Sequence, residues 1–184
     1  LEDRNEAWRD DLRKATPAKE RVNIPRVKMN ELDPKIRARC YEEVNQGLNK
    51  EQAQKEATRC MDCVNPTCME GCPVCINIPG FIKNIERGEF VEAAKVLRRT
   101  SALPAVCGRV CPQEKQCESK CFYKLKLKKE AVGIGYLERF AADYERERGK
   151  MSVPETKTKN GIKIAVVGSG PAGLSFAGDM EKAG

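Results

Sequence analysis

The 184-residue sequence contains no histidine, few aromatic residues and no long hydrophobic run. In the absence of histidine, the side chains best suited to bind soft metal ions are the ten cysteines. Aromatic residues make up 5% and charged residues 33%, so we expect a modest apolar core. No segment approaches the roughly 20 apolar residues of a membrane-spanning helix, and the charged N-terminus is unlike a secretion signal. We therefore expect a cytoplasmic protein with reduced thiols and no membrane partner.

The formal net charge is +7 at pH 7. Basic residues alternate with acidic ones, and no combination of aromatic and basic residues suggests a nucleic-acid partner. The excess charge is interpreted as a solvated surface, with a docking face for an acidic redox partner as the alternative. The chain begins at Leu1 rather than Met and ends at Gly184, so we expect it to be part of a longer protein.

Eight of the ten cysteines form two compact sets, which are Cys60, Cys63, Cys68 and Cys72, and Cys107, Cys111, Cys117 and Cys121. Thiolates this close along a chain repel one another unless a cation neutralises them, and iron–sulfur clusters need converging sulfur ligands of this kind. Structural zinc is the alternative, because zinc also binds four thiolates. Among these eight cysteines, however, only Cys60 and Cys63 have the two-residue spacing of a zinc knuckle. The spacing therefore favours two cubane clusters.

Cys72 and Cys111 are each followed by proline. In two-cluster ferredoxins the cysteine before proline ligates the other cluster. In a linear assignment each set holds its own cluster. In a crossed assignment Cys72 joins the second set, and the first set needs a fourth donor from elsewhere. The spacing leaves both assignments open.

Hydrophobic periodicity predicts a mainly helical chain with a short β-strand near its end. Helices are expected over 6–14, 34–47, 50–59, 79–87, 89–99, 132–147 and 174–182, a basic loop over 124–129, and a strand over 162–167. Asp33-Pro34 and Asn49 are typical helix starts. The predicted organisation is a charged N-terminal segment (1–33), a helical iron–sulfur domain (34–148), a linker (149–161) and the start of a nucleotide-binding domain (162–184).

A glycine-rich sequence follows the predicted strand, namely Gly168, Ser169, Gly170, Pro171, Ala172 and Gly173. A G-x-G-x-x-G pattern between a strand and a helix is typical of the dinucleotide-binding turn of a Rossmann domain. Gly168 would allow the tight turn, Gly170 the approach of a pyrophosphate, and Gly173 the close packing of helix on strand. One strand and one helix cannot close a sheet, so we expect a truncated α/β unit.

The order of these motifs resembles the N-terminal part of the small (β) subunit of NADPH-dependent glutamate synthase. The same module occurs in dihydropyrimidine dehydrogenase and in related flavin-dependent transhydrogenases. The resemblance extends from about Pro25 to Gly184 and is carried by Cys60–Cys63, Gly71–Pro73, Leu103–Pro112 and Gly168–Gly173. It implies an α-helical ferredoxin-like domain with two [4Fe-4S] clusters, followed by domains that bind FAD and NADPH.

The resemblance also implies a function and a ligand set. The intact protein would be an oxidoreductase acting on CH-NH2 donors, and this chain would relay electrons to a glutamate synthase large (α) subunit or an equivalent flavin domain without being active alone. The implied ligation is the crossed one, with Cys72, Cys111, Cys117 and Cys121 on one cluster, and Cys60, Cys63, Cys68 and Glu138 on the other. Cys107 would be a neighbour. Apart from the resemblance, Cys40 lies on the apolar face of its predicted helix and is expected to be a small core residue, and Cys75, just beyond Cys72-Pro73, is expected to lie outside the ligand set. The alternative for Glu138 is a surface glutamate beside Arg139.

Overall fold

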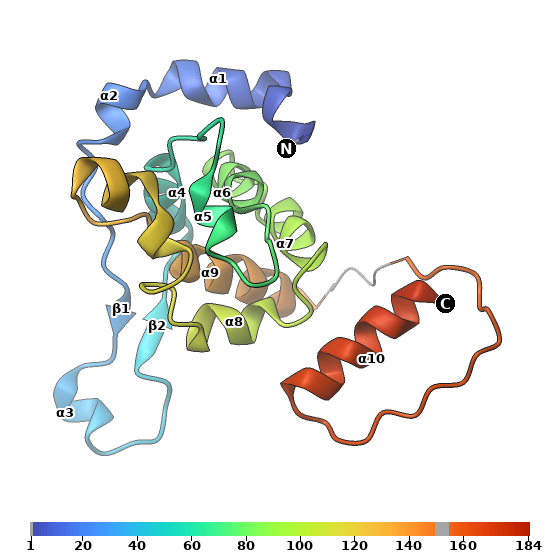
Figure 1. Cartoon of the computed structure of the whole chain (residues 1–184). Helices are drawn as coiled ribbons and strands as arrows, with labels where there is room; N and C mark the ends of the chain where they lie inside the picture. Colours follow the sequence, from blue (N-terminus) through green and yellow to red (C-terminus); the bar gives the residue numbers. More distant parts are fainter. Residues whose placement is uncertain (1, 150–154) are drawn as a thin grey trace.

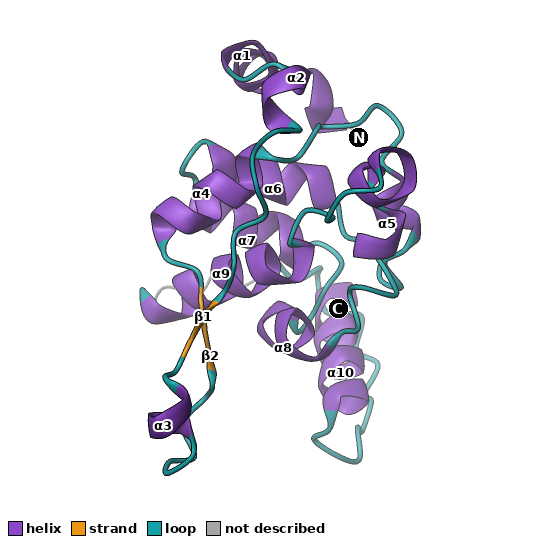
Figure 2. Ribbon diagram, turned by 90° about the vertical axis from the view of Figure 1, so that its left-hand side faces the viewer, coloured by secondary structure: helices purple, strands orange, loops and turns teal. Residues whose placement is uncertain are grey.

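The computed structural model describes residues 2–149 and 155–184, so that Leu1 and residues 150–154 of the expected linker lie outside it. The chain is mainly helical, as predicted (Figures 1 and 2). Within the described ranges, no helix combines the length and the apolar character that crossing a membrane requires. The elements, in chain order, are η1 (Glu2–Asn5), α1 (Ala7–Ala15), α2 (Ala18–Arg21), β1 (Asn30–Glu31), α3 (Pro34–Arg37), β2 (Asn45–Gly47), α4 (Lys50–Thr58), α5 (Thr67–Glu70), α6 (Ile78–Glu86), α7 (Phe90–Arg98), α8 (Pro104–Val110), η2 (Glu118–Lys120), η3 (Tyr123–Leu127), α9 (Ile134–Glu147) and α10 (Pro171–Ala183).

The core lies among helices α4, α6, α7 and α9, which the apolar periodicity predicts. Phe81, Ile85 and Leu137 are fully buried there. Phe90 packs edge-on against Phe140, with ring centroids 5.0 Å apart. Burying a side chain of this size stabilises the fold by about 1.5–3 kcal/mol, so these few large residues carry much of the core. The four helices form the frame on which the cysteine segments lie.

A capping box fixes the start of α4, the helix that leads into the first cysteine set. The Asn49 side chain accepts a hydrogen bond from the Gln52 main-chain N–H (2.8 Å), and the Gln52 side chain accepts one from the Asn49 N–H (2.9 Å). The pair satisfies two N–H groups that the helix leaves without partners. The predicted start at Asn49 is confirmed.

The helix predicted from Pro34 to Gly47 is wrong beyond its first turn. Asp33 caps it as expected, but α3 ends at Arg37, and the chain returns as strand β2, which pairs antiparallel with β1. The predicted apolar stripe has no core to cover, because Ile36 is 58% exposed and Cys40 is only half-buried. Figure 1 shows this β1–α3–β2 arm projecting from the helical group.

Two short helical segments lie where loops or breaks were expected. Helix α8 begins at Pro104 and contains Cys107, and the basic loop 124–129 is largely the π-helical turn η3. This turn ends at Lys128, which has a left-handed φ of 55°. A seven-residue helix is too short to show a clear apolar period, so the sequence gives little indication of it.

Buried polar contacts join the N-terminal segment to the helical domain. The fully buried Glu56 carboxylate of α4 accepts hydrogen bonds from the Val27 N–H (2.7 Å), the Gly133 N–H (2.8 Å) and Arg59 (2.6 Å). One side chain therefore fixes the approach of the N-terminal segment and the start of α9.

The strand predicted over 162–167 is not formed in the described part of the chain, where no other strand lies beside it. Val167 is almost fully exposed and Ile164 is half exposed. A strand needs a neighbour to pair its main-chain groups, so an apolar β-branched run does not form one alone. The helix that follows is present as α10 but begins earlier than predicted, with Gly170 as N-cap and Pro171 in the first turn.

Candidate functional site

The first group of thiols surrounds a small, largely apolar cavity. Its four cysteines are Cys60, Cys63, Cys68 and Cys121, and the remaining walls include Ile78, Ile82 and Val132. Cys60 and Cys63 follow α4, Cys68 lies in α5, and Cys121 ends η2. The thiol of Cys121 therefore comes from a segment more than fifty residues further along the chain than Cys68.

Burial and mutual repulsion favour the protonated forms of Cys60, Cys63 and Cys68 when nothing neutralises them. Burial raises the pKa of Cys60 to about 11. Burial and then the neighbouring Cys121 raise the pKa of Cys63, while burial followed by Cys60 and Cys121 raises the pKa of Cys68 strongly. A cationic core among these sulfurs would stabilise the thiolate forms, since metal ligation requires deprotonated thiols. The donor set fits a metal–sulfur group.

The second group combines cysteines of both sets with Glu138 of α9. Cys72, Cys107 and Glu138 lie within electrostatic range of Cys111, whose pKa is raised to about 11, first by burial and next by Cys107. Cys117 lies within range of Cys72 and Glu138, and burial is the main reason that its pKa rises to about 12. The group contains five possible donors, of which one is a carboxylate.

Glu138 is buried and has an unsatisfied oxygen. Its side chain is 5% exposed, and its Oε1 atom has no hydrogen-bond partner. Burial raises the pKa of its carboxyl group to about 7. A buried polar atom without a partner is costly, so one in a native structure suggests a bound ion or group. Glu138 is therefore not the surface glutamate of the alternative interpretation.

The structure groups the candidate ligands differently from both assignments that the sequence leaves open. Cys121 lines the cavity of the first set, and Glu138 lies within electrostatic range of Cys111 and Cys117. This grouping agrees with the crossed assignment in where Cys72 lies, and differs from it in where Cys121 and Glu138 lie.

Main-chain contact between the two cysteine segments explains this interleaving. A Cβ atom added to Gly71 would lie 2.6 Å from the carbonyl oxygen of Gln116 and 3.0 Å from the Cα of Cys117. Only glycine allows so close an approach. Because Cys72 follows Gly71 directly, the contact brings it to the second set, and Cys121 on the other side of η2 reaches the first.

The two remaining cysteines lie apart from these groups, and Arg109 near Cys111 has carboxylate partners. Cys75 is exposed, and Cys40 lies half-buried in the projecting arm. Arg109 donates to Asp143 (2.7 Å) and Glu43 (2.8 Å) rather than to a cysteine.

Over residues 2–149 and 155–184, no three cysteine or acidic side chains are placed to hold one metal ion.

Two glycines of the glycine-rich turn lie at backbone positions that disfavour a side chain. Gly168 has a φ of 105°, and a Cβ at Gly173 would lie 2.3 Å from the Gly168 carbonyl oxygen. Both positions therefore require glycine. Ser169, Gly170, Pro171 and Ala172 complete the turn and begin α10, so its N-terminal N–H groups lie at the turn.

Sequence reasoning missed the residues that hold the turn between Cys60 and Cys63. Asp62 is buried with a left-handed φ of 50°, and its carboxylate pairs with Arg9 and Arg13 of α1. The partners are about fifty positions apart, so no local pattern connects them. An aspartate between two candidate ligands was the only available signal.

A helical frame with two groups of partly buried thiols is typical of an iron–sulfur protein. Residues 37–150 match the family model described as dihydropyrimidine dehydrogenase domain II, 4Fe-4S cluster. The chain therefore belongs to this family of oxidoreductase iron–sulfur domains, and the family resemblance predicted from its motifs is confirmed.

Curated relatives agree with this assignment. The chain is 36% identical over 174 residues to the glutamate synthase [NADPH] small chain of Escherichia coli K12, covering 95% of this chain and 34% of that protein. It is 39% identical over 133 residues to the NAD-dependent dihydropyrimidine dehydrogenase subunit PreT of the same strain, covering 72% of this chain and 31% of that protein. The chain thus spans about a third of the length of these relatives.

Proposed function

We propose that the chain holds two [4Fe-4S] clusters, the first on Cys60, Cys63, Cys68 and Cys121, and the second on Cys72, Cys111, Cys117 and Glu138. The observation that carries the proposal is the cavity lined by four cysteines from two distant segments. The orphaned Oε1 atom of Glu138 beside Cys111 and Cys117 supports the second site. Cys107 is left as a neighbour of the second site, as the family resemblance implies.

The residues around each site would hold the group, exclude water and set its electrostatic surroundings. A bound [4Fe-4S] cluster transfers one electron at a time, at a potential set by ligands, burial and nearby hydrogen bonds. Ile78, Ile82 and Val132 shield the first site from solvent. The buried carboxylate of Glu138 gives the second site a harder donor than a thiolate. The two sites would therefore differ in potential.

In the intact protein we propose an electron-transfer role within an NADPH-dependent, glutamate-synthase-like flavoprotein. Electrons from NADPH would pass through FAD and this domain to a flavin site on a large subunit or an equivalent domain. The glycine turn Gly168–Gly173 would approach the pyrophosphate of the dinucleotide, with the N-terminus of α10 facing its negative charge. The relative that covers 95% of this chain is named a glutamate synthase small chain, which supports this choice. The chain alone would transfer electrons without transforming a substrate.

Anaerobic iron and sulfide quantification on the reconstituted chain tests the two-cluster proposal. We expect about eight iron and eight sulfide ions per chain, with broad visible absorption. A colourless protein with stoichiometric zinc would overturn it in favour of a zinc-stabilised module. A measured content of about four irons per chain would rule out one of the two proposed sites.

A dihydropyrimidine-dehydrogenase-like reaction is the second candidate, because PreT is 39% identical over 133 residues. Oxidation of NADPH or NADH by the full-length protein with its partner separates the two. Oxidation coupled to glutamate formation supports the first, and oxidation coupled to pyrimidine reduction supports the second.

A further inference from the structure

The turn that carries Cys60 and Cys63 depends on a residue in an unfavourable conformation. Asp62 has a left-handed φ of 50°, which is uncommon for any residue except glycine. Asp62 lies between Cys60 and Cys63, so its conformation shapes the turn that carries both thiols. Some other part of the molecule has to hold Asp62 in place.

Arginines of the N-terminal segment hold it. Arg9 and Arg13 of α1 both donate to the Asp62 carboxylate, and Arg4 Nε donates to its carbonyl oxygen at 3.1 Å. The side chains of Arg9 and Asp62 are fully buried. Three guanidinium groups thereby fix both the main-chain carbonyl and the carboxylate of Asp62.

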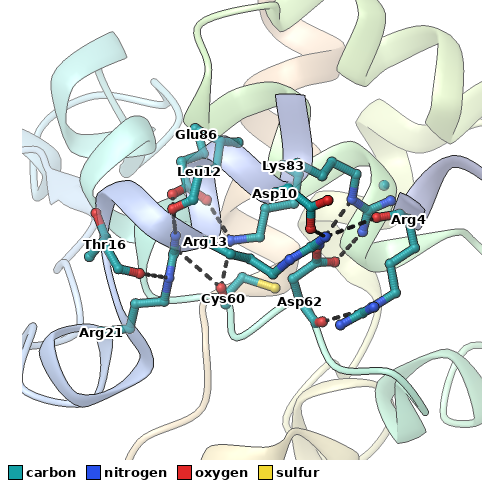
Figure 3. Close-up of polar contacts among 12 residues, drawn as sticks. Arg4, Asp10, Leu12, Arg13, Thr16, Arg21, Cys60, Asp62, Lys83 and Glu86 are labelled. Carbon is teal, nitrogen blue, oxygen red and sulfur yellow. Dashed lines mark hydrogen bonds and ion pairs between the residues drawn. The ribbon is translucent and has the colours of Figure 1, made fainter. Parts of the chain in front are cut away.

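The carbonyl oxygen of Cys60 is fixed in the same way from the other side. Lys83 of α6 donates to it at 2.6 Å, and Arg21 of α2 at 3.3 Å. Glu86 joins these two cations, at 2.5 Å from Lys83 and 2.8 Å from Arg21. Figure 3 shows the cationic side chains converging on the stretch from Cys60 to Asp62.

This network is poorly explained as an anchor for α1 alone. Buried ion pairs often contribute little to stability compared with apolar side chains of similar volume, because the charges must be desolvated. The network comprises the cations Arg4, Arg9, Arg13, Arg21 and Lys83 and the anions Asp10, Asp62 and Glu86. It therefore carries two excess positive charges next to candidate thiolate ligands. Such charge suits a site that must become anionic.

We propose that α1 is a positioning element of the first cluster site, in which Arg9 and Arg13 act through Asp62 to hold the Cys60–Cys63 turn ready for ligation. The inference rests on the proposed two-cluster function. The family model begins at residue 37, so it does not include these arginines. Residues that orient metal ligands typically contribute 10–100-fold to metal affinity.

The test uses Arg13→Gln, because the Arg13 side chain is 23% exposed and its loss leaves Arg9 in place. Arg13→Lys is the conservative variant, and Lys95→Gln is the control, since Lys95 forms an exposed pair with Glu92 on α7. The reconstituted chains are treated anaerobically with an iron chelator, and the rate of iron release is recorded.

We expect Arg13→Gln to release half of its iron roughly 10–100-fold faster than the unsubstituted chain and the other half at the unchanged rate. Arg13→Lys should restore most of the difference, and Lys95→Gln should behave as the unsubstituted chain. In a Cys111→Ser background, which retains only the first site, Arg13→Gln should accelerate release of all remaining iron.

Equal acceleration of both halves would show general destabilisation and overturn the inference, as would unchanged release. Asp62→Asn provides the second variant, because it keeps the side-chain shape and removes the charge that the arginines hold. It should reproduce the biphasic release, and a single unchanged phase would contradict the proposed role of Asp62. If the unsubstituted chain takes up no iron, the proposed function fails. If it takes up about eight irons and Arg13→Gln releases them normally, only this inference fails.

Discussion

Replacing Gly108 by alanine should push α8 away from α9 beside the second group of cysteines. A Cβ atom at Gly108 would lie 2.6 Å from the main-chain nitrogen of Arg139 and 2.8 Å from its Cα. Ordinary contact begins near 3.4 Å, so the helices must separate by several tenths of an ångström. Gly108 follows Cys107, and Arg139 follows Glu138. The movement therefore separates Cys111, which directly follows α8, from the Glu138 carboxylate.

The expected change in the free energy of unfolding on replacing Gly108 follows from two opposing effects. Overpacking costs about 1–3 kcal/mol, and a backbone–backbone clash lies toward the upper end of this range. Alanine in a helix recovers up to about 1 kcal/mol relative to glycine. We expect a net loss of about 1–2 kcal/mol, which lowers the melting temperature by about 2–8 °C for a chain of this size. The second site should lose iron while the first keeps its own.

Thermal unfolding followed by circular dichroism, together with iron quantification, checks both parts. Gly178→Ala is the matched control, because Gly178 also lies within a helix but a Cβ atom there would have no neighbouring atom within 4 Å. This control should be neutral or slightly stabilising. A Gly108→Ala chain with unchanged melting temperature and full iron content would refute the reasoning.

Three further outcomes are expected. Gly71→Ala should weaken both sites, because it separates the segments that carry Cys72 and Cys117, and iron content should fall below half. Glu138→Ala should remove iron from the second site only, while Cys107→Ser leaves both sites loaded; electron paramagnetic resonance of the reduced chain would reveal the reverse result. Glu56→Ala should destabilise the fold by about 3–5 kcal/mol, since it leaves the buried Arg59 charge and two main-chain N–H groups without their acceptor; denaturant unfolding measures this, and a loss below about 1 kcal/mol would contradict it.

The long helices could be predicted because their apolar residues recur over several turns and their caps are local. Asn49 shows this for α4, and its capping box needs only the next three residues. The failure at Pro34–Gly47 has the same origin. Ile36, Cys40 and Val44 follow a helical period, but periodicity cannot tell whether a core exists for that face to cover.

The cysteine spacing indicated which thiols could gather, while Glu138 came from the family resemblance, and the division of these residues between two groups was not visible in the sequence. The exchange of Cys121 and Glu138 between the two groups depends on the contact of Gly71 with the segment before Cys117, which is a tertiary contact. The burial of Glu138 likewise depends on how α8 packs on α9. Asp62 and its arginines were missed because ion pairs between residues far apart leave no local pattern.

The short helix η2 has a consequence for electron transfer between the two groups of cysteines. Cys117 and Cys121 flank Glu118–Lys120, and of these two only Cys121 lines the cavity of the first group. At about 2 Å of rise per residue, their Cα atoms are on the order of 8 Å apart along a 3₁₀ segment. The distance that an electron must tunnel between the two proposed clusters would thus be set by the covalent chain from Cys117 to Cys121, and not by the docking of separate helices. Thermal motion of the surrounding helices could change the surroundings of the two centres without lengthening the path that joins them.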